Sequence, residues 1–425
     1  MATNAKKIML QTNTKTLAKL FNISCITNVE FSGIYTDTRQ RMDGGVFLAI
    51  IGDNFDAHDY IKKAEEMGAV AIITSKPVLT TLPVLKVNDT LQALNDIAKY
   101  HLNQVNPTTI AITGSNGKTT TKNLLANILD LSAPTLKTQG NLNNHLGVPM
   151  TLLKLESHHQ YAVIEMGANH LDEIAHLRDI VNPDVAAVTN TGDAHIGEFG
   201  SKENLIKAKG EIYSNHSKNI VNTQTTFKGD ISFGEGGDIY ADNISGNCFD
   251  LHIFNNQTSV CLQLIGKHNI DNALAASACA HALDINIEMI KTGLEATTAE
   301  NGRLNILETE HFTLIDDSYN ASPASITAAL ETLQNFKSEL VVVLGDMAEL
   351  GKDEATLHQQ MGIQAHKITN HLYTVGGLAK HYQGKHFNSK QALSEHLIKN
   401  HTDATILIKG SRIAKLDELV KLLQK

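Results

Sequence analysis

Short apolar runs alternate with amphipathic stretches along almost the whole chain. Near the beginning, apolar runs at 45–50 and 69–74 flank a helical stretch near 59–67, and a longer helix begins near Thr90. Apolar runs of this length, bounded by glycine and polar residues, predict strands. Their alternation with helices predicts a small α/β unit from about residue 16 to 104.

A second series of apolar runs, at 110–112, 162–166 and 185–189, is separated by helical stretches. Between the first two runs, four apolar residues repeat at helical spacing: Leu124, Leu125, Ile128 and Leu129. This order predicts a largely parallel sheet with a ligand site at the carboxyl ends of its strands. The turn-rich stretch 228–264 predicts a small antiparallel extension.

A third series of apolar runs follows Arg303, each with a helical stretch after it: 312–316, 340–344, 372–375 and 405–408. Near-continuous apolar strands are typical of a sheet that is covered on both faces, so this part is expected to be a doubly wound, Rossmann-like α/β domain. Asn106 and Pro107 break the helix that precedes the second series. We therefore expect an α/β protein of three domains: 1–107, 108–306 and 307–425.

The most specific local pattern lies at 110–121, where an apolar strand, a glycine turn and a helix start follow one another. Gly114 and Gly117 allow backbone amides and the positive helix end to face an anion, Lys118 adds a charge, and Thr119 offers a hydroxyl to Mg²⁺. A strict P-loop has a glycine five positions before the second of these glycines, where this chain has isoleucine. The pattern is therefore a shorter P-loop variant, and the alternative is a turn without a ligand.

Composition narrows the class of protein further. The 425 residues are 42% apolar with a net charge of -9, and no apolar run is long enough to span a membrane. A soluble, cytoplasmic protein without a signal peptide and without a nucleic-acid partner is expected. The cysteines are scattered, which favours reduced thiols over disulfides or a thiolate metal site: Cys25, Cys248, Cys261 and Cys279.

Three further residues are suited to metal or phosphate chemistry. Glu165 ends an apolar run, His195 follows the next one, and Lys209 lies fourteen positions beyond His195. A carboxylate at a strand end can bind a metal ion near phosphates. Taken singly, each residue has an ordinary alternative: a surface acid, a structural histidine and a surface lysine. Lys207 is an alternative to Lys209.

Several segments together resemble the Mur ligase family over nearly the whole chain: 113–119, 141–144, 164–169, His195 with Lys209, 266–273 and 301–303. Three more segments, at 55–59, 316–323 and 345–351, resemble the member of the family that adds a terminal dipeptide. The resemblance implies a UDP-sugar domain, a central P-loop-type ATPase domain and a C-terminal ligase domain, in that order.

The resemblance also implies a reaction. An ATP- and Mg²⁺-dependent ligase would join D-Ala-D-Ala to UDP-MurNAc-tripeptide in cytoplasmic peptidoglycan precursor synthesis, acting as a monomer. The peptide carboxylate would attack the γ-phosphate of ATP, and the dipeptide amine would displace phosphate from the resulting acyl phosphate. The products would be UDP-MurNAc-pentapeptide, ADP and phosphate.

The family's site residues carry over onto matching positions of this chain. The catalytic group would be Lys118, Glu165, His195 and Lys209. Magnesium would be held by Thr119, Glu165, His195 and Lys209, the last as a carbamate. ATP would be held by Thr113, Gly114, Ser115, Asn116, Gly117, Lys118, Thr119, Thr120, His268, Asn269, Asn272, Arg303 and Asp317. The other substrates would contact Thr36, Asp37, Thr38, Arg39, His58, Asn141, Asn143, Asn144, Asn320, Asp346, Lys409, Ser411 and Arg412.

Four alternatives remain at this stage. Two are ligases with the same central domain: the enzyme that adds the third residue of the muramyl peptide, and folylpolyglutamate synthase. A nucleotide-dependent switch or motor would use the phosphate loop to change shape. A catalytically silent binding protein would be expected to lack Lys118 or Glu165, and this chain has both.

Overall fold

The computed structural model describes residues 11–24, 27–39, 41, 43–52, 55–192 and 196–424. Their contacts divide the chain into two compact units. The first unit holds residues 1–110, 133–166 and 176–183, and the second unit holds 111–132, 167–175 and 184–425. Among the described residues, no helix is both long enough and apolar enough to cross a bilayer.

The first unit contains a small parallel sheet, within the α/β unit that the sequence predicts. Its strand order is β3-β4-β7-β8, with bounds Ile34–Tyr35, Gly45–Leu48, Ala69–Thr74 and Val84–Lys86. Helix α2 (Ile61–Glu66) packs Ile61 against a core that includes Phe47 and Ile72. The remaining elements here are α1 (Thr14–Leu20) and two short antiparallel pairs, β1 (Gln11–Asn13) with β2 (Glu30–Ser32) and β5 (Ile51–Gly52) with β6 (Phe55–Asp56).

Helix α3 (Thr90–Val105) ends this part of the chain where the sequence predicts a break. The Asp89 carboxylate accepts hydrogen bonds from the first-turn amides of Leu91 and Gln92, and Asn106 ends the helix in the left-handed conformation at φ 51°. Asparagine tolerates that conformation and proline cannot continue a helix. Strand β9 (Thr108–Thr113) therefore starts directly after Pro107.

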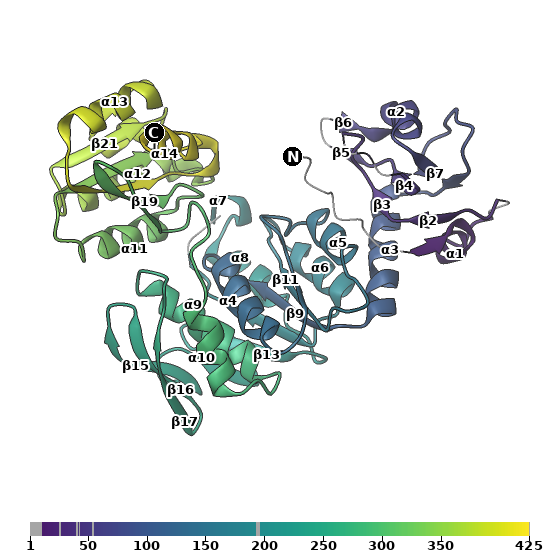
Figure 1. The fold of residues 1–425 in the computed structure, drawn as a ribbon, viewed down its shortest axis with the longest axis horizontal. Helices are drawn as coiled ribbons and strands as arrows, with labels where there is room; N and C mark the ends of the chain where they lie inside the picture. The colour runs from purple at the N-terminus through teal and green to yellow at the C-terminus, as the bar shows by residue number, and fades with distance from the viewer. Residues whose placement is uncertain are drawn as a thin grey trace. The chain divides into compact units, whose positions relative to one another are not determined.

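The central sheet has nine strands in the order β10-β11-β9-β12-β13-β14-β15-β16-β17. The pairs β10–β11, β12–β13 and β13–β14 are parallel, whereas β15, β16 and β17 form the antiparallel extension predicted for 228–264 (Figure 1). The bounds besides β9 are Thr135–Lys137, Tyr161–Glu165, Val185–Val188, Lys218–Asn222, Ile231–Phe233, Ile239–Ser245, Cys248–Ile253 and Asn256–Cys261 for β10 to β17.

Helix α4 (Lys118–Asp130) follows β9 and buries the predicted apolar stripe, because Leu124, Leu125, Ile128 and Leu129 are fully covered. It packs against α9 (His268–His281) and α10 (Ile287–Glu295). The approach to α10 is close: a Cβ on Gly293 would lie 2.5 Å from the Ile128 Cα. The other helices of this part are α5 (Gly147–Leu152), α6 (Glu173–Val181), α7 (Ile196–Phe199) and α8 (Lys202–Gly210).

The C-terminal sheet has six strands in the order β18-β19-β23-β20-β21-β22, of which only β18 runs antiparallel to its neighbour. Along β20, Val342 and Leu344 enter one apolar core with α11 and α12, and Val341 and Val343 enter another with α13 and α14. Helices therefore cover both faces, which confirms the doubly wound prediction. The bounds of β18 to β23 are Asn305–Glu308, Phe312–Asp317, Leu340–Gly345, His371–Val375, Lys385–Phe387 and Ala404–Lys409. The bounds of α11 to α14 are Pro323–Leu333, Glu354–His366, Lys390–Asn400 and Asp417–Leu423.

The expectation of reduced thiols is wrong for one pair of cysteines. Cys248 and Cys261 form a disulfide across the β16–β17 hairpin, where they lie opposite each other with Cα atoms 4.0 Å apart. The two cysteines are thirteen residues apart in the sequence. The antiparallel register places the start of β16 beside the end of β17 and so brings them together. Cys279 is a buried free thiol, as expected, and Cys25 lies outside the described residues.

Candidate active site

The loop between β9 and α4 has the backbone that its two glycines predict. Gly114 has φ +148° and Gly117 has φ +79°. Residues with a Cβ atom rarely adopt such backbone angles. A Cβ on Gly114 would lie 2.0 Å from the Thr189 Oγ1, and one on Gly117 would lie 2.1 Å from the Asn272 Oδ1. Both conformation and space therefore require glycine at these two positions.

Residues after strand β12 hold the loop in place. The Thr189 hydroxyl donates to the Asn116 carbonyl at 2.6 Å, and the Asn190 side chain both donates to that carbonyl at 3.0 Å and accepts from the Asn116 amide at 3.2 Å. The Ser115 hydroxyl donates to the Gly192 carbonyl at 2.8 Å. Sequence reasoning missed Thr189 and Asn190 as supports, although their position after a predicted strand was a usable indication.

Positive charge gathers at the start of α4. The Lys118 ammonium donates to the carbonyls of Gly114 at 2.7 Å and Ser115 at 3.3 Å, so it lies over the loop. Gly117 precedes the helix and has no side chain with which to cap it, and no acidic residue lies in the first turn. The first-turn amides, the helix dipole and the ammonium together form an anion-binding site. Thr113 ends β9, and Thr120 lies in the first turn of α4.

Arg303 brings a second cation to the same helix. Its Nη2 donates to the Thr119 hydroxyl at 2.9 Å, and its guanidinium stacks on the Tyr319 ring at 4.1 Å. Its buried Nε lies 3.9 Å from the Glu300 Oε2, too far for a hydrogen bond, and has no hydrogen-bond partner among the described residues. An unsatisfied buried N–H is costly, and an anionic oxygen would satisfy it. Sequence reasoning missed Tyr319, which orients this arginine.

The start of α9 completes the surroundings of the loop. The Asn272 side chain lies against Gly117 and donates to the Asn269 Oδ1 at 3.0 Å, while Asn269 donates to the Ile265 carbonyl at 2.7 Å. Burial lowers the pKa of His268 to about 4, with a smaller contribution from the Lys409 ammonium. His268 is therefore neutral at pH 7 and offers a planar, uncharged ring.

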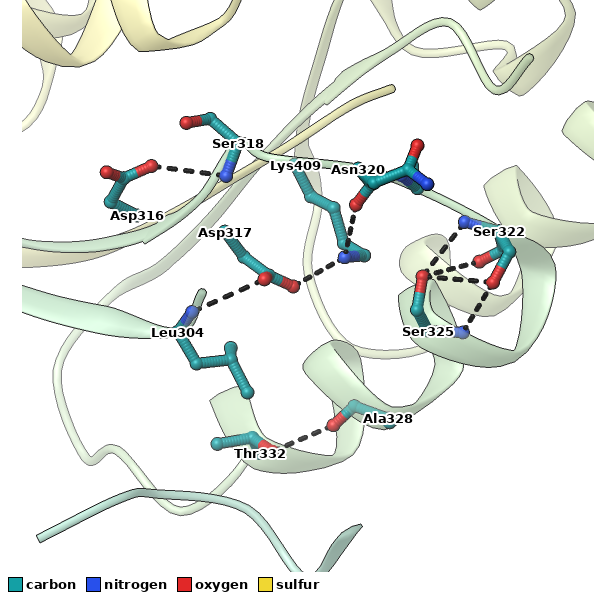
Figure 2. A network of polar contacts seen from close by, with 11 residues as sticks. Leu304, Asp316, Asp317, Ser318, Asn320, Ser322, Ser325, Ala328, Thr332 and Lys409 are labelled. Carbon is teal, nitrogen blue, oxygen red and sulfur yellow. Dashed lines mark hydrogen bonds and ion pairs between the residues drawn. The ribbon is translucent and has the colours of Figure 1, made fainter. Parts of the chain in front are cut away.

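Asp317 and Lys409 form a buried ion pair at the carboxyl ends of β19 and β23. Figure 2 shows the Lys409 ammonium in contact with both the Asp317 carboxylate and the Asn320 carbonyl. It donates to the Asp317 Oδ2 at 2.5 Å and to the Asn320 carbonyl at 2.9 Å. Burial raises the pKa of the Asp317 carboxyl, and the Lys409 ammonium acts in the opposite direction. The pair places one charged group at the end of each of two neighbouring strands.

Replacing Lys409 with methionine is expected to destabilise the protein by about 3 kcal/mol or more, because it leaves the Asp317 carboxylate buried without its counter-charge. Urea unfolding followed by circular dichroism measures the change. Lys421→Met is the matched control, since Lys421 pairs with Asp417 at 3.3 Å on the surface and should cost at most about 0.5 kcal/mol. Equal losses in the two variants would contradict the prediction.

Asp346 and Ser411 are engaged in supporting the fold. The Asp346 carboxylate accepts from the amides of Ala379 at 2.7 Å and Gly377 at 3.1 Å. The Asp346 carbonyl accepts from both the amide and the hydroxyl of Ser411, at 2.8 and 2.6 Å. The Arg412 Cζ lies 5.8 Å from the centroid of the Tyr319 ring. These contacts fix the loops after β20 and β23, where the sequence placed the amine-binding residues.

Lys209 is a buried amine, whereas Lys207 is exposed. The Lys209 Nζ lies 3.4 Å from the Ala168 carbonyl and 5.2 Å from the centre of the Phe199 ring. Burial, together with a smaller contribution from the Lys118 charge, lowers the pKa of Lys209 to about 7, and Glu173 and Glu211 act in the opposite direction. Of the two lysines that the sequence left open, Lys209 is thus the one whose amine is buried and has a lowered pKa.

Within the first unit, Glu165 ends β11 with its side chain buried. Its Oε1 accepts from the Asn143 Nδ2 at 2.8 Å, and its amide donates to the Thr138 hydroxyl at 2.9 Å. Asn144 accepts from the Gly147 amide at 2.9 Å at the start of α5, and Asn141 is exposed. The structure thus brings the Asn141–Asn144 loop to the strand end that carries Glu165. His195 lies outside the described residues.

The remaining predicted residues lie in the N-terminal sheet region. The His58 Nε2 accepts from the Ser75 amide at 3.2 Å, and its Nδ1 lies 2.5 Å from the Asp56 Oδ1, which indicates the Nδ1–H tautomer. Asp37 binds Arg39 through two oxygens on the surface, with the Arg39 Nη2 at 2.6 Å from the Asp37 Oδ2. Thr36 and Thr38 are half-buried beside them. His58 is thus fixed, and Arg39 is accessible.

A glycine turn between a strand and a helix, a lysine over that turn and an arginine on the helix hydroxyl define a P-loop-type nucleotide-binding α/β protein. Family models for the Mur ligase middle domain and the Mur ligase, glutamate ligase domain match residues 112–280 and 302–418. The chain belongs to the Mur ligase family.

Individual relatives match over nearly the full length. The UDP-N-acetylmuramoyl-tripeptide--D-alanyl-D-alanine ligase of Haemophilus influenzae is 34% identical, with 97% of this chain and 98% of the relative covered. A crystal structure of MurF from Acinetobacter baumannii is 36% identical with a TM-score of 0.93, covering 97% of this chain and 99% of that one. The MurF ligase of Thermotoga maritima, solved in complex with ADP, is 26% identical with a TM-score of 0.85, covering 92% and 97%.

Proposed function

We propose that this protein is the ATP-dependent ligase that joins D-Ala-D-Ala to UDP-MurNAc-tripeptide, forming UDP-MurNAc-pentapeptide, ADP and phosphate. The observation that carries the proposal is the match to a relative of that name over 97% of the chain, which includes the N- and C-terminal regions that flank the nucleotide loop. A shared central domain alone would not distinguish the substrates of different ligases.

The chemistry explains why so many cations are needed. A carboxylate is a poor electrophile because its oxygen is a poor leaving group, so ATP must first phosphorylate it. The attack of one anion on another requires charge stabilisation. We assign Lys118 and the loop amides to the β- and γ-phosphates, and Arg303 to the nucleotide phosphates. The peptide carboxylate oxygen then bonds to the γ-phosphorus as ADP leaves, and the dipeptide amine attacks the acyl carbon as phosphate leaves.

Magnesium fits the donor set of this chain. Mg²⁺ prefers hard oxygen ligands, and Thr119 offers a hydroxyl while Glu165 offers a buried carboxylate at a strand end. We assign these two residues, with His195 and a carbamate on Lys209, to the magnesium sites. When bound, the metal supplies charge stabilisation to the phosphates. The buried, deprotonatable amine of Lys209 supports the carbamate because only a neutral amine attacks carbon dioxide.

The remaining predicted residues are assigned to the nucleotide and to the two other substrates. Asn269, Asn272 and His268 are placed at the nucleotide, with Asp317 at its ribose. The UDP-sugar end of the acceptor is assigned to Thr36, Asp37, Thr38, Arg39, His58, Asn141, Asn143 and Asn144. The amine and peptide end is assigned to Asn320, Asp346, Lys409, Ser411 and Arg412. The domain boundaries proposed are 1–107, 108–306 and 307–425, in a monomer that acts in the cytoplasm.

Phosphate release from ATP is expected to depend strictly on both UDP-MurNAc-tripeptide and D-Ala-D-Ala, because the acyl phosphate requires the first and is discharged by the second. A coupled phosphate assay with each substrate omitted in turn measures this dependence. Steady release without either substrate would favour a nucleotide-dependent switch. Release supported by a muramyl dipeptide and a single amino acid would favour the ligase that adds the third residue.

A further inference from the structure

A polar cluster of Glu339, His371 and His401 lies at the amino-terminal edge of the C-terminal sheet. Glu339 directly precedes β20, His371 begins β21, and His401 lies shortly before β23. Since these strands are parallel, the cluster is at the edge opposite to Asp317 and Lys409. A six-residue strand, about 20 Å long, separates the two edges.

The three side chains converge through short contacts. The His371 Nε2 lies 3.0 Å from the Glu339 Oε1, and the His401 Nδ1 lies 3.0 Å from the Glu339 Oε2. One carboxylate oxygen and one ring nitrogen from each histidine all lie within 4.8 Å of one another. Among the described residues, no other group of three histidine, cysteine or acidic side chains meets that condition.

We propose that Glu339, His371 and His401 form a binding site for a divalent transition-metal ion, with zinc as the best fit. Two imidazoles and one carboxylate are a ligand set that zinc accepts, leaving a fourth position for water. Zinc bonds of about 2.0 to 2.2 Å place tetrahedral ligands roughly 3.4 Å apart, so small side-chain movements would suffice. Two imidazole nitrogens among three ligands suit zinc better than Mg²⁺, whereas the magnesium sites assigned to the ligase reaction draw mainly on oxygen donors.

Contacts with neighbouring residues hold His401 and the backbone of Glu339 in place. The His401 ring is almost fully buried, and its Nε2 lies 2.8 Å from the Tyr373 hydroxyl. A tyrosine hydroxyl can donate or accept, so this contact persists when metal binding removes the proton from the opposite nitrogen of the ring. The Glu339 carbonyl accepts from the Thr405 amide at 2.8 Å, which holds the backbone of Glu339 beside β23.

The site is open to solvent on its other side. The side chains of His371 and Glu339 are 42% and 39% exposed, so a hydrated ion has an entry path. His371 can therefore be replaced without creating a cavity. A bound ion would connect the starts of three strands, β20, β21 and β23, and stabilise the folded state by mass action.

The test uses the full chain without a histidine tag, freed of metal by chelation and dialysed into excess MgCl₂ to occupy magnesium sites. Calorimetric titration with ZnCl₂ is expected to show one equivalent bound, and Co²⁺ is expected to give the visible absorption of a tetrahedral site. His371→Gln should weaken zinc binding by at least about 10-fold, since loss of even an outer-shell partner has that effect. At the same zinc concentration, the thermal unfolding midpoint should rise more in the wild type than in the variant.

His381→Gln is the matched control, because His381 is an exposed histidine of the same domain outside the cluster. It should bind zinc as the wild type does. Glu339→Gln, which keeps the size of the side chain and removes its charge, should also weaken binding. Absence of stoichiometric zinc binding would overturn the proposal, as would equal affinity in the wild type, His371→Gln and Glu339→Gln. Loss of ligase activity in His371→Gln before zinc is added would also count against a site separate from catalysis.

Discussion

Replacing Lys118 with alanine is expected to abolish ligation while leaving the fold intact. The Lys118 ammonium lies over the loop, within 2.7 Å of the Gly114 carbonyl, where the amides at the start of α4 form the anion site. Loss of a single preorganised donor to a developing charge typically lowers kcat by about 10²- to 10³-fold. Lys118 carries a full charge as well as its hydrogen bonds, so a decrease of at least about 10³-fold is expected. The phosphate-release assay with both substrates measures it.

Two variants make this result specific to the position and shape of the cation. Lys118→Arg keeps the charge but exchanges a compact ammonium for a planar guanidinium, so it should also lose most of the activity. Lys228→Ala removes an exposed lysine before β14 and should have no effect. All three proteins should unfold at similar temperatures. Wild-type turnover in Lys118→Ala would remove the assignment of the phosphate loop.

The sequence predicted the sheets well because strands covered on both faces must be apolar at nearly every position. The run at 340–344 became β20, whose residues alternate between two cores, and the run at 312–316 became β19. The glycine loop was predictable for a different reason. Its conformation depends on Gly114 and Gly117, which lie within the segment itself.

Features that depend on distant neighbours were not predictable in this way. Thr189 and Asn190 support the loop from more than seventy residues away, and Tyr319 supports Arg303 from another strand end. The disulfide follows from the register of a hairpin. These contacts form only when the sheet is assembled. The local pattern of apolar and polar residues therefore does not predict them.

The choice between Lys207 and Lys209 also depends on neighbours from outside the segment, although the two lysines are only two residues apart. Residues that are two positions apart on an α-helix are rotated by about 200° around its axis, so their side chains face opposite sides. The sequence of α8 has no pronounced apolar stripe that would identify its buried side. The structure buries Lys209 and exposes Lys207, and the neighbours responsible, Ala168 and Phe199, come from outside the helix.

Replacing Lys209 with alanine is expected to lower kcat by at least about 10²-fold, because the carbamate assigned to it would place an anionic oxygen among phosphates and magnesium. The carbamate forms when the neutral amine bonds to the carbon of CO₂ and releases a proton. Burial lowers the pKa of Lys209 to about 7, so the amine is mostly neutral above that pH and protonated below it. Carbamate formation, and with it activity, should therefore decline as the pH falls through about 7.

Assays in buffer depleted of carbon dioxide, between pH 6 and 8.5, distinguish this role from a structural one. Wild-type activity should fall on depletion and return when bicarbonate is added, with the return weakest at the acid end. Lys209→Ala should not respond to bicarbonate, and Lys207→Ala, which changes an exposed lysine, should behave as the wild type does. A carbon-13 resonance from labelled bicarbonate on the wild type, absent in Lys209→Ala, would locate the carbamate directly. If the wild type keeps full activity without carbon dioxide at every pH, Lys209 acts as an unmodified amine, which carries a positive charge near Lys118 only below about pH 7.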